Sequence, residues 1–429
     1  MAPVDRLRTA APLGTPLPRS ARFERPSRAW PRPRLKSRTQ LTILYPMKVS
    51  QQVWEPSRGW RTVGADGGVR HAALVWVFAD SALLLMERLH EVHHRFPGAV
   101  AVGCSTAGEV HGTTVSDQTV VATVLEFESS SIQVRYAAIT SAEQSVEVGR
   151  ELASSLPTDG LKHVIVLSDG LRVNGSALTR GVVGGLPVGV SVSGGLAADG
   201  ARFQRTSVIG HDSIAPGVVS AIGFYGPDLQ VGCASLGGWD PFGPERTVTR
   251  ALGNVLFEMD GKSALELYKT YLGPKAAELP GSGLLFPLAI RVGTAAPVVR
   301  TILAVNEAEG SITFAGDVPV GSHARLMKAN FDRLIDGTRG AAASSRAALH
   351  ETPCDFALLI SCVGRKLVLG QRTEEEVEGV REVVGDRAVL AGFYSYGEIS
   401  PFTSGAACEL HNQTMTITTF AERPHAPAA

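Results

Sequence analysis

The chain has 429 residues, of which 44% are hydrophobic and 19% are charged, so it has enough apolar side chain for two or three domains. Basic and acidic residues both number 41, and the resulting zero net charge gives no support to a nucleic-acid partner. The sequence has no run of about 18 apolar residues and no apolar core of a secretory signal. We therefore expect no membrane span and a cytoplasmic location.

Residues 1–46 differ in composition from the rest of the chain. They hold nine Arg and one Lys against one Asp and one Glu, together with eight Pro. Such a segment buries too little apolar surface to offset its ordering entropy, so we expect a disordered basic extension. An arm or transit peptide would also fit. Met47 opens a different composition, and we favour it as the natural start.

Three segments share one plan: an apolar strand, a polar tip, an amphipathic helix, a second apolar strand and a glycine-rich loop. The first comprises strand 75–78, helix 81–95, strand 99–102 and loop GCSTAGE at 103–109; the second, strand 163–167, helix 176–184, strand 188–192 and loop SGGLAADG at 193–200; the third, strand 356–360, helix 374–384, strand 388–391 and loop GFYSYGE at 392–398.

The first and third loops both read G-x-x-[ST]-x-G-E, which indicates a duplicated β-α-β unit. Near-continuous apolar strands with helices between them predict an α/β fold with some α+β character, in which mixed sheets are flanked by helices. Three further strand pairs read as hairpins, and a helix is expected at 263–273; the pairs are 119–127 with 131–139, 217–226 with 229–235, and 298–306 with 311–318.

Asp260-Gly261 is a turn signal before the helix at 263–273 and predicts a domain boundary. We expect two related domains, 70–262 and 263–421, followed by a frayed tail at 422–429.

Several motifs carry a resemblance to a known family. They are VVGGLPVGVSVSGGLAADG (182–200), VTRALGNVLFEMDG (248–261), VNEAEGSITFAGDVPVGSHARLM (305–327), SCVGR (361–365), GFYSYGEISP (392–401) and LHNQTMTIT (410–418). On these the chain resembles the FIST proteins, which are built from an N-terminal and a C-terminal FIST domain. The resemblance implies a small-ligand sensory module of signal transduction, with amino acids or their derivatives as expected ligands. We expect no output domain of its own, so the signal would pass to a separate partner protein.

Loops at sheet ends are the default ligand site in α/β proteins, because adjoining strand ends leave a crevice. The site residues that we expect to bind the ligand are Cys104, Ser105, Thr106, Glu109, Ser168, Asp169, Gly194, Gly195, Arg365, Tyr394, Tyr396, Glu398 and Asn412. Glu109 or Glu398 would hold an ammonium group, and Arg365 would hold a carboxylate in a two-pronged contact.

Each of these residues also has a structural interpretation. A Glu after a glycine turn often accepts N–H bonds from a neighbouring loop. Arg365 would also serve as a buried partner of one of those carboxylates, and Asn412 as a member of a structural network. The glycines would set the backbone shape.

An enzyme remains an alternative. Cys104 follows a buried strand, and Cys362 lies close to Arg365, so either would be a candidate nucleophile of a hydrolase or transferase. The loop GCSTAG does not match G-x-S-x-G, and free cysteines are often buried as small hydrophobic residues. A protein-binding adaptor without a small ligand is a further alternative.

The five cysteines, Cys104, Cys233, Cys354, Cys362 and Cys408, show neither a disulfide framework nor zinc-ligand spacing. We therefore expect no metal, no cofactor and no assigned catalytic residue.

Overall fold

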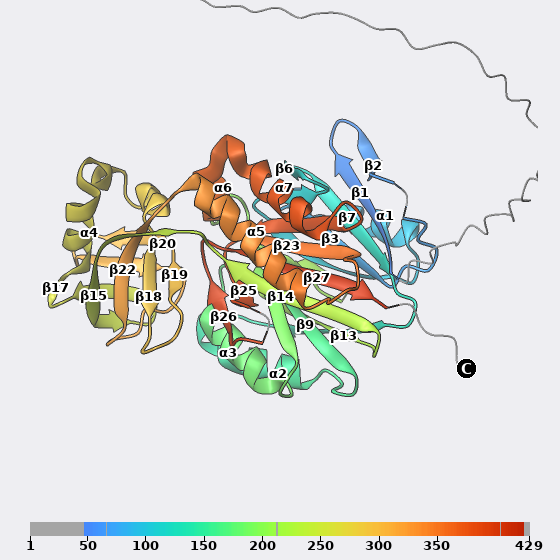
Figure 1. The fold of residues 1–429 in the computed structure, drawn as a ribbon, viewed down its shortest axis with the longest axis horizontal. Helices are drawn as coiled ribbons and strands as arrows, with labels where there is room; N and C mark the ends of the chain where they lie inside the picture. The colour runs from blue at the N-terminus through green and yellow to red at the C-terminus, as the bar shows by residue number, and fades with distance from the viewer. Residues whose placement is uncertain (1–46, 66, 212, 404, 424–429) are drawn as a thin grey trace, which may run out of the picture. The chain divides into compact units, whose positions relative to one another are not determined.

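The computed structural model describes residues 47–65, 67–211, 213–403 and 405–423, and the strands in these ranges form four sheets (Figure 1). Three of the sheets are mixed and have helices alongside them, which confirms the predicted mixed α/β class. The predictions for residues 1–46 lie outside the described residues. None of the helices in the described ranges is both long enough and apolar enough to cross a membrane.

Each mixed sheet is built around one of the three predicted β-α-β units, and all three strand pairs are parallel. The first unit has β3 (Leu74–Asp80), α1 (Met86–Arg95) and β4 (Val100–Thr106); the second, β9 (Leu161–Ser168), α3 (Gly175–Gly185) and β10 (Ser191–Leu196); the third, β23 (Phe356–Cys362), α6 (Val363–Leu369), α7 (Thr373–Val384) and β24 (Val389–Ser395).

Two antiparallel strands extend each unit on the side of its first strand. The pairs are β7 (Val120–Glu126) with β1 (Lys48–Glu55), β13 (Val218–Tyr225) with β8 (Ser131–Ala138), and β27 (Met415–Glu422) with β14 (Leu229–Leu236). Strand β2 (Gly59–Val63) completes the first sheet beyond β1. The three sheets therefore repeat one strand order.

On the other side, each sheet is completed by a strand that belongs to another unit. The strand that follows the loop of the first unit, β5 (Glu109–His111), pairs with β24 of the third. The strand that follows the third loop, β25 (Glu398–Pro401), pairs with β10 of the second. Finally, β11 (Val208–Ile209) pairs with β4 of the first. The three units thus close into a ring with approximate threefold symmetry. The short outer strands are β6 (Thr114–Ser116), β12 (Ile214–Ala215) and β26 (Cys408–His411).

A fourth, antiparallel sheet follows the second unit in the chain. It contains β15 (Asp240–Leu252), β16 (Val255–Met259), β17 (Lys262–Ser263), β18 (Leu288–Arg291), β19 (Val298–Arg300), β20 (Ile302–Asn306), β21 (Ser311–Phe314) and β22 (His323–Lys328), with helix α4 (Ala264–Leu272) packed beside it. We call residues 240–328 the small sheet unit. Its own core includes Tyr268 and Phe314, both fully buried.

The remaining helices cover the mixed sheets. Helix α2 (Ser145–Ser154) packs on α3, and α5 (Phe331–Ala347) packs on α7 and on β14. Short 3-10 helices lie at Ala142–Gln144, Gly273–Glu278, Gly281–Leu285 and Gly370–Arg372. The side-chain oxygen of Asn174 caps α3 by accepting from the N–H of Ala177, and Asn330 caps α5 in the same way through Arg333.

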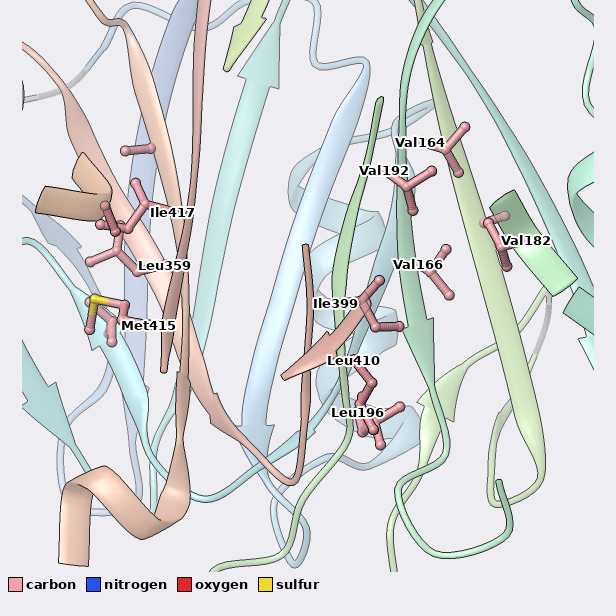
Figure 2. Packing of buried hydrophobic residues seen from close by; sticks show 14 of the residues in the cluster. Val164, Val166, Val182, Val192, Leu196, Leu359, Ile399, Leu410, Met415 and Ile417 are labelled. Carbon is pink, nitrogen blue, oxygen red and sulfur yellow. The ribbon is translucent and has the colours of Figure 1, made fainter. Parts of the chain in front are cut away.

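The apolar strands form a core shared by the second and third units. Val164, Val166 and Val192 of the second unit and Leu359 and Ile417 of the third belong to one buried cluster, shown in Figure 2. In the same view Leu196, Ile399 and Leu410 lie together, although they come from both halves of the sequence. Burial of such side chains contributes about 1.5–3 kcal/mol each and holds the ring closed.

Two of the three predicted hairpins are wrong. Strands β7 and β8 belong to different sheets, and so do β13 and β14. Each short polar connection is a corner between sheets and not a two-strand turn. The third hairpin is confirmed, because β20 pairs with β21. Helix α1 begins at Met86, five residues after its expected start, because Asp80 accepts from the N–H of Ala82 and forms a turn there.

Strands from both sides of residue 262 share sheets. Strand β14 pairs with β27, β10 pairs with β25, and β15 and β16 lie in one sheet with β22. The sequence division at 262 and 263 therefore runs through interleaved sheets. Glu422, the first residue of the expected tail, is the last residue of β27.

Candidate functional site

The three glycine-rich loops meet through a cyclic set of backbone hydrogen bonds. The N–H of Ala107 donates to the carbonyl of Tyr394 (2.9 Å), that of Tyr396 to Leu196 (3.2 Å), and that of Ala198 to Ser105 (2.9 Å). Each loop thus donates to a neighbour and accepts from the other one. The loops of all three units therefore meet at one place.

The first residues of the three expected loops lie in strands instead, because β4, β10 and β24 run on to Thr106, Leu196 and Ser395. Each of these strands carries a glycine where the neighbouring parallel strand passes too close for a side chain. A Cβ atom at Gly103 would lie 1.8 Å from the carbonyl oxygen of Val77, and at Gly392 it would lie 1.8 Å from that of Leu359. Gly194 stands at the corresponding position of the second unit, 2.0 Å from the oxygen of Val166. Gly194 and Gly195 also form the backbone pairing with β25. These glycines set the backbone shape at the place where the three loops meet, which we call the loop centre.

Glu109 and Glu398 occupy equivalent positions and have equivalent partners. Glu109 accepts from the hydroxyl of Thr106 and from the hydroxyl (2.7 Å) and N–H (3.2 Å) of Thr119. Glu398 accepts from Ser395 (2.6 Å) and from the hydroxyl (3.1 Å) and N–H (3.4 Å) of Thr414. Both carboxyl groups are fully buried, so both hold the loop to the following strand.

Burial dominates the electrostatics of both groups. It raises the pKa of Glu109 to about 7 and that of Glu398 to about 8, although their hydroxyl and N–H donors act in the opposite direction. Close to neutral pH, each group therefore changes charge readily when its surroundings change.

Arg365 is paired with a carboxylate that lies in neither loop. Its guanidinium contacts Glu376 on α7 at 2.8 Å, and both side chains are fully buried. The remaining donors bind the carbonyl oxygens of Gly237 and Leu334 and the hydroxyl of Thr338. Glu376 also accepts from the hydroxyl groups of Tyr394 (2.6 Å) and Ser361 (3.1 Å). Arg365 and Tyr394 thus share one internal network.

The second loop is organised by Asp199, which accepts from the N–H groups of residues 203–205 and from the hydroxyl of Tyr396. Tyr396 is stacked on Phe203, with ring centroids 4.3 Å apart. Burial alone raises the pKa of Asp199, but these donors bring it below its usual value.

Ser168 is the last residue of β9, and Asp169 follows it. The Asp169 carboxylate accepts from the N–H groups of Leu171, Arg172 and Gly217. The hydroxyl of Ser168 donates to the carbonyl of Asp169, and that of Ser105 accepts from the N–H of Ser207. The Asp169 contacts fix turns of the second unit, whereas the Ser105 contact joins β4 of the first unit to the chain after the second loop.

Cys104 and Cys362 are both buried. Burial raises the pKa of Cys104 well above its usual value and that of Cys362 to about 12. Backbone N–H groups of Gln413, Gly364 and Arg365 oppose the rise at Cys362. Neither thiol has the lowered pKa of an activated nucleophile.

Asn412 and its neighbour Gln413 differ from the other site residues because their polar atoms are unsatisfied. Both side chains are fully buried, yet neither the oxygen nor the nitrogen of either amide has a hydrogen-bond partner among the described residues. Their turn joins β26 to β27 and has Gln413 at a φ of 61°. We call Asn412 and Gln413 the amide pair.

The amide pair is enclosed by the loop centre. Thr414, the next residue, binds Glu398, and the carbonyl of Gln413 accepts from the indole N–H of Trp239 (2.7 Å). A Cβ at Gly364 would lie 2.5 Å from the Gln413 amide nitrogen, so that glycine leaves space for the amide.

Gln413 and Glu376 are absent from the residues expected from the sequence. Glu376 stands in the acidic run TEEEVEG, but Thr373, Val377 and Val380 share its helical face, and that apolar spacing marks it as inward-facing. Gln413 adjoins Asn412 in LHNQT, where a second carboxamide was the available signal. No group of three metal-ligating side chains occurs in the part of the chain that the structure describes.

Two family models match the chain, the FIST N domain over residues 73–262 and the FIST C domain over residues 264–401. A search of curated proteins gave no match. Among solved structures, the chain is similar to a cyanuric acid hydrolase from A. caulinodans, with 10% identity over 69% of this chain and 100% of the other and a TM-score of 0.16. A likeness at that score carries no argument about fold or activity.

Proposed function

Because the chain belongs to the FIST family, whose domains are sensory domains of signal transduction, we propose that it is a small-ligand sensor and that the amide pair is its ligand site. The proposed ligands are amino acids or their derivatives. The two proposed domains, 70–262 and 263–421, act together, because strands of both surround the loop centre.

The observation that carries the proposal is the set of four unsatisfied amide atoms on Asn412 and Gln413. A buried polar atom without a partner costs about 1–3 kcal/mol, so a native protein satisfies such atoms with water or with a guest molecule. Four of them on two adjacent residues favour a guest that carries both donors and acceptors.

Glu398 supplies the charge that an amino acid requires. An ammonium group beside it favours the ionised carboxylate and lowers its pKa from about 8. The amide N–H groups of Asn412 and Gln413 take the ligand carboxylate. We assign that role to them and not to Arg365, because the donors of Arg365 are used by Glu376 and by backbone oxygens.

Enclosure of the site links binding to signalling. A ligand shifts a conformational equilibrium only if it binds one conformation better than the other. Because the amide pair has no exposed surface, entry requires an open conformation and retention favours the closed one. A separate partner protein in the cytoplasm would respond to that difference.

No specific observation favours the enzyme alternative. Burial raises the pKa of both candidate thiols, which opposes thiolate formation. The adaptor alternative is decided by the ligand experiment below.

The test is a thermal-shift screen of amino acids and their derivatives on residues 47–429, followed by calorimetry. A ligand at 100 times its Kd stabilises the folded state by about 2.7 kcal/mol. We expect Asn412→Ala to weaken binding at least tenfold without lowering the stability of the free protein, because an unsatisfied buried amide is removed. Gln204→Ala, an exposed amide, is the matched control.

The expected pH dependence has a definite sign. If the ligand ammonium ionises Glu398, binding releases a proton below about pH 8, so affinity rises with pH up to that value. Calorimetry in two buffers of different ionisation enthalpy measures this proton release. Absence of any ligand across the panel would contradict the sensor proposal and favour the adaptor.

A further inference from the structure

A cleft of about 220 Å³ separates the small sheet unit from the second and third β-α-β units. Residues of β18 and β19 form one side of it, and residues of α3 and β26 form the other. None of the site residues named above lines it. The cleft is smaller than the roughly 300–1,000 Å³ of drug-sized pockets, so it suits a small molecule.

Arg300 supplies a buried positive charge to this cleft. The residue is only 5% exposed to solvent. Nε donates to the carbonyl of Asp317 (3.1 Å), and Nη1 donates to the carbonyl of Leu410 (2.8 Å). Nη1 also donates to the carbonyl of Val299 (3.5 Å). Among the described residues Nη2 makes no hydrogen bond, and Asp317 and Glu409 act on the guanidinium only from beyond ion-pair distance.

Burial lowers the pKa of Arg300 to about 10, and the charges of Asp317 and Glu409 oppose that shift only in part. A buried charge that nearby carboxylates compensate only in part is costly, and a bound anion removes more of that cost. The planar guanidinium matches a carboxylate, which it binds through parallel N–H bonds.

Ser176 is the second polar residue of the cleft that lacks a partner. The residue lines the cleft, is 7% exposed, and its hydroxyl has no partner among the described residues. An unpaired buried hydroxyl costs free energy unless a guest bonds to it. Arg300 and Ser176 thus offer donors from opposite sides of the cleft.

The two carboxylates of the cleft do not occupy these donors. Asp317 is paired with Arg180 (3.2 Å) and accepts from the side-chain amide of Asn174 (2.9 Å). Glu409 is exposed, where solvent and salt screen its charge.

Aliphatic side chains form most of the remaining wall. Ile290, Val292 and Val298 come from the small sheet unit, and Leu410 comes from β26. An apolar wall beside one buried cation and one hydroxyl is complementary to a short hydrocarbon chain that ends in a carboxylate.

We propose that this cleft is a second binding site, which takes short-chain aliphatic monocarboxylates through Arg300 and Ser176. The carboxylate bridges β19 and α3, and the chain lies against Ile290, Val298 and Leu410. Its occupant therefore joins the small sheet unit to the second and third β-α-β units.

The test uses pentanoate as the probe, with pentanamide as the uncharged control of equal shape, and measures binding by calorimetry on residues 47–429. We expect saturable binding of pentanoate and at least tenfold weaker binding of pentanamide. Ser176→Ala should weaken pentanoate binding three- to tenfold, and Arg300→Lys should weaken it at least tenfold, because a compact ammonium lacks the two-pronged geometry.

Asn412→Ala keeps this test separate from the sensor proposal, because it alters the amide pair and leaves the cleft intact. Pentanoate should bind that variant with unchanged affinity. If Arg300→Lys does not fold, Ser176→Val decides instead, since the added methyl groups occupy the cleft and should abolish binding.

Equal affinity for pentanamide, unchanged affinity in Ser176→Ala, or no saturable pentanoate binding would each overturn the second site. Loss of pentanoate binding in Asn412→Ala would place the probe at the amide pair and overturn it as well.

Discussion

Single residues at the loop centre have structural roles that the sequence predicted in part. Glu109 follows a glycine turn and caps the N–H of Thr119, which was one of the two roles expected of it. Arg365 is a buried ion-pair partner, but of Glu376 and of neither loop carboxylate. The sequence did not reveal that pairing, because the two residues lie on different helices, α6 and α7, and their contact depends on how those helices pack.

The raised pKa of Glu109 predicts that the folded state loses stability as the pH rises from 5 to 8. Burial raises its folded-state pKa from 4.5 to about 7, so the folded state holds its proton more tightly than the unfolded chain. The resulting stability is complete below about pH 4.5 and is lost as the pH rises through 7. One pKa unit corresponds to about 1.4 kcal/mol, so we expect a loss of roughly 1–3 kcal/mol between pH 5 and pH 8.

Chemical denaturation at several pH values measures this loss. Glu109→Gln should reduce the fall in the free energy of unfolding between pH 5 and pH 8. Glu126→Gln is the control: burial raises the pKa of Glu126, but the N–H groups of His71 and Arg70 and the Lys48 ammonium bring it to about 2. Its contribution is present above pH 4.5 and is lost as the pH falls towards 2. If Glu109→Gln left the fall in the free energy of unfolding between pH 5 and pH 8 unchanged, the raised pKa of Glu109 would be contradicted.

At the scale of elements, the local sequence pattern predicted the features that depend on neighbouring residues. All three parallel strand pairs follow from apolar runs and are confirmed. A helix lies between the strands of each pair, but α1 begins five residues late without a side-chain cap, and α6 occupies residues that were expected to be a polar tip. The hairpins at β7–β8 and β13–β14 failed because a short polar connection is compatible with a turn and also with a corner between sheets. Which of the two forms depends on partners far away in the chain.

The glycine that opens the third loop gives an element-scale prediction. In Gly392→Ala the new Cβ would lie 1.8 Å from the carbonyl oxygen of Leu359, and both atoms belong to rigid, fully paired strands. We expect a loss of at least ~2 kcal/mol in the free energy of unfolding, measured in urea.

Gly184→Ala is the matched control, because Gly184 lies in α3 and nothing lies within 4 Å of the position that the alanine methyl group would occupy. Alanine there should stabilise the protein by about 0.5–1 kcal/mol through its higher helix propensity. Equal effects of the two substitutions would refute the close approach of the strands.

At the scale of the whole molecule, the closed ring makes the two halves of the chain interdependent. Residues 47–262 contain β10 without β25, β14 without β27, and an incomplete small sheet unit. Expressed alone, they should lack a cooperative thermal transition and bind a dye specific for exposed apolar surface.

Residues 47–429 provide the reference for that experiment and should unfold in a sharp transition. A sharp transition for residues 47–262 alone would show that the first half folds independently. The sequence division at 262 could not reveal this interdependence, because strand exchange between units leaves no mark on local composition or periodicity.

The late position of β27 has a consequence for protein synthesis. Among the described strands, β14 has β27 as its one pairing partner, and 178 residues separate the end of β14 at Leu236 from Met415. A ribosome that adds about 5–20 residues per second leaves β14 unpaired for roughly 10–40 s. Every nascent chain thus carries an open strand edge for that time, and a message truncated before codon 415 yields a product that cannot hide it. We therefore expect the nascent chain to need chaperones and truncated fragments to be degraded rapidly, because β27 is synthesised long after β14.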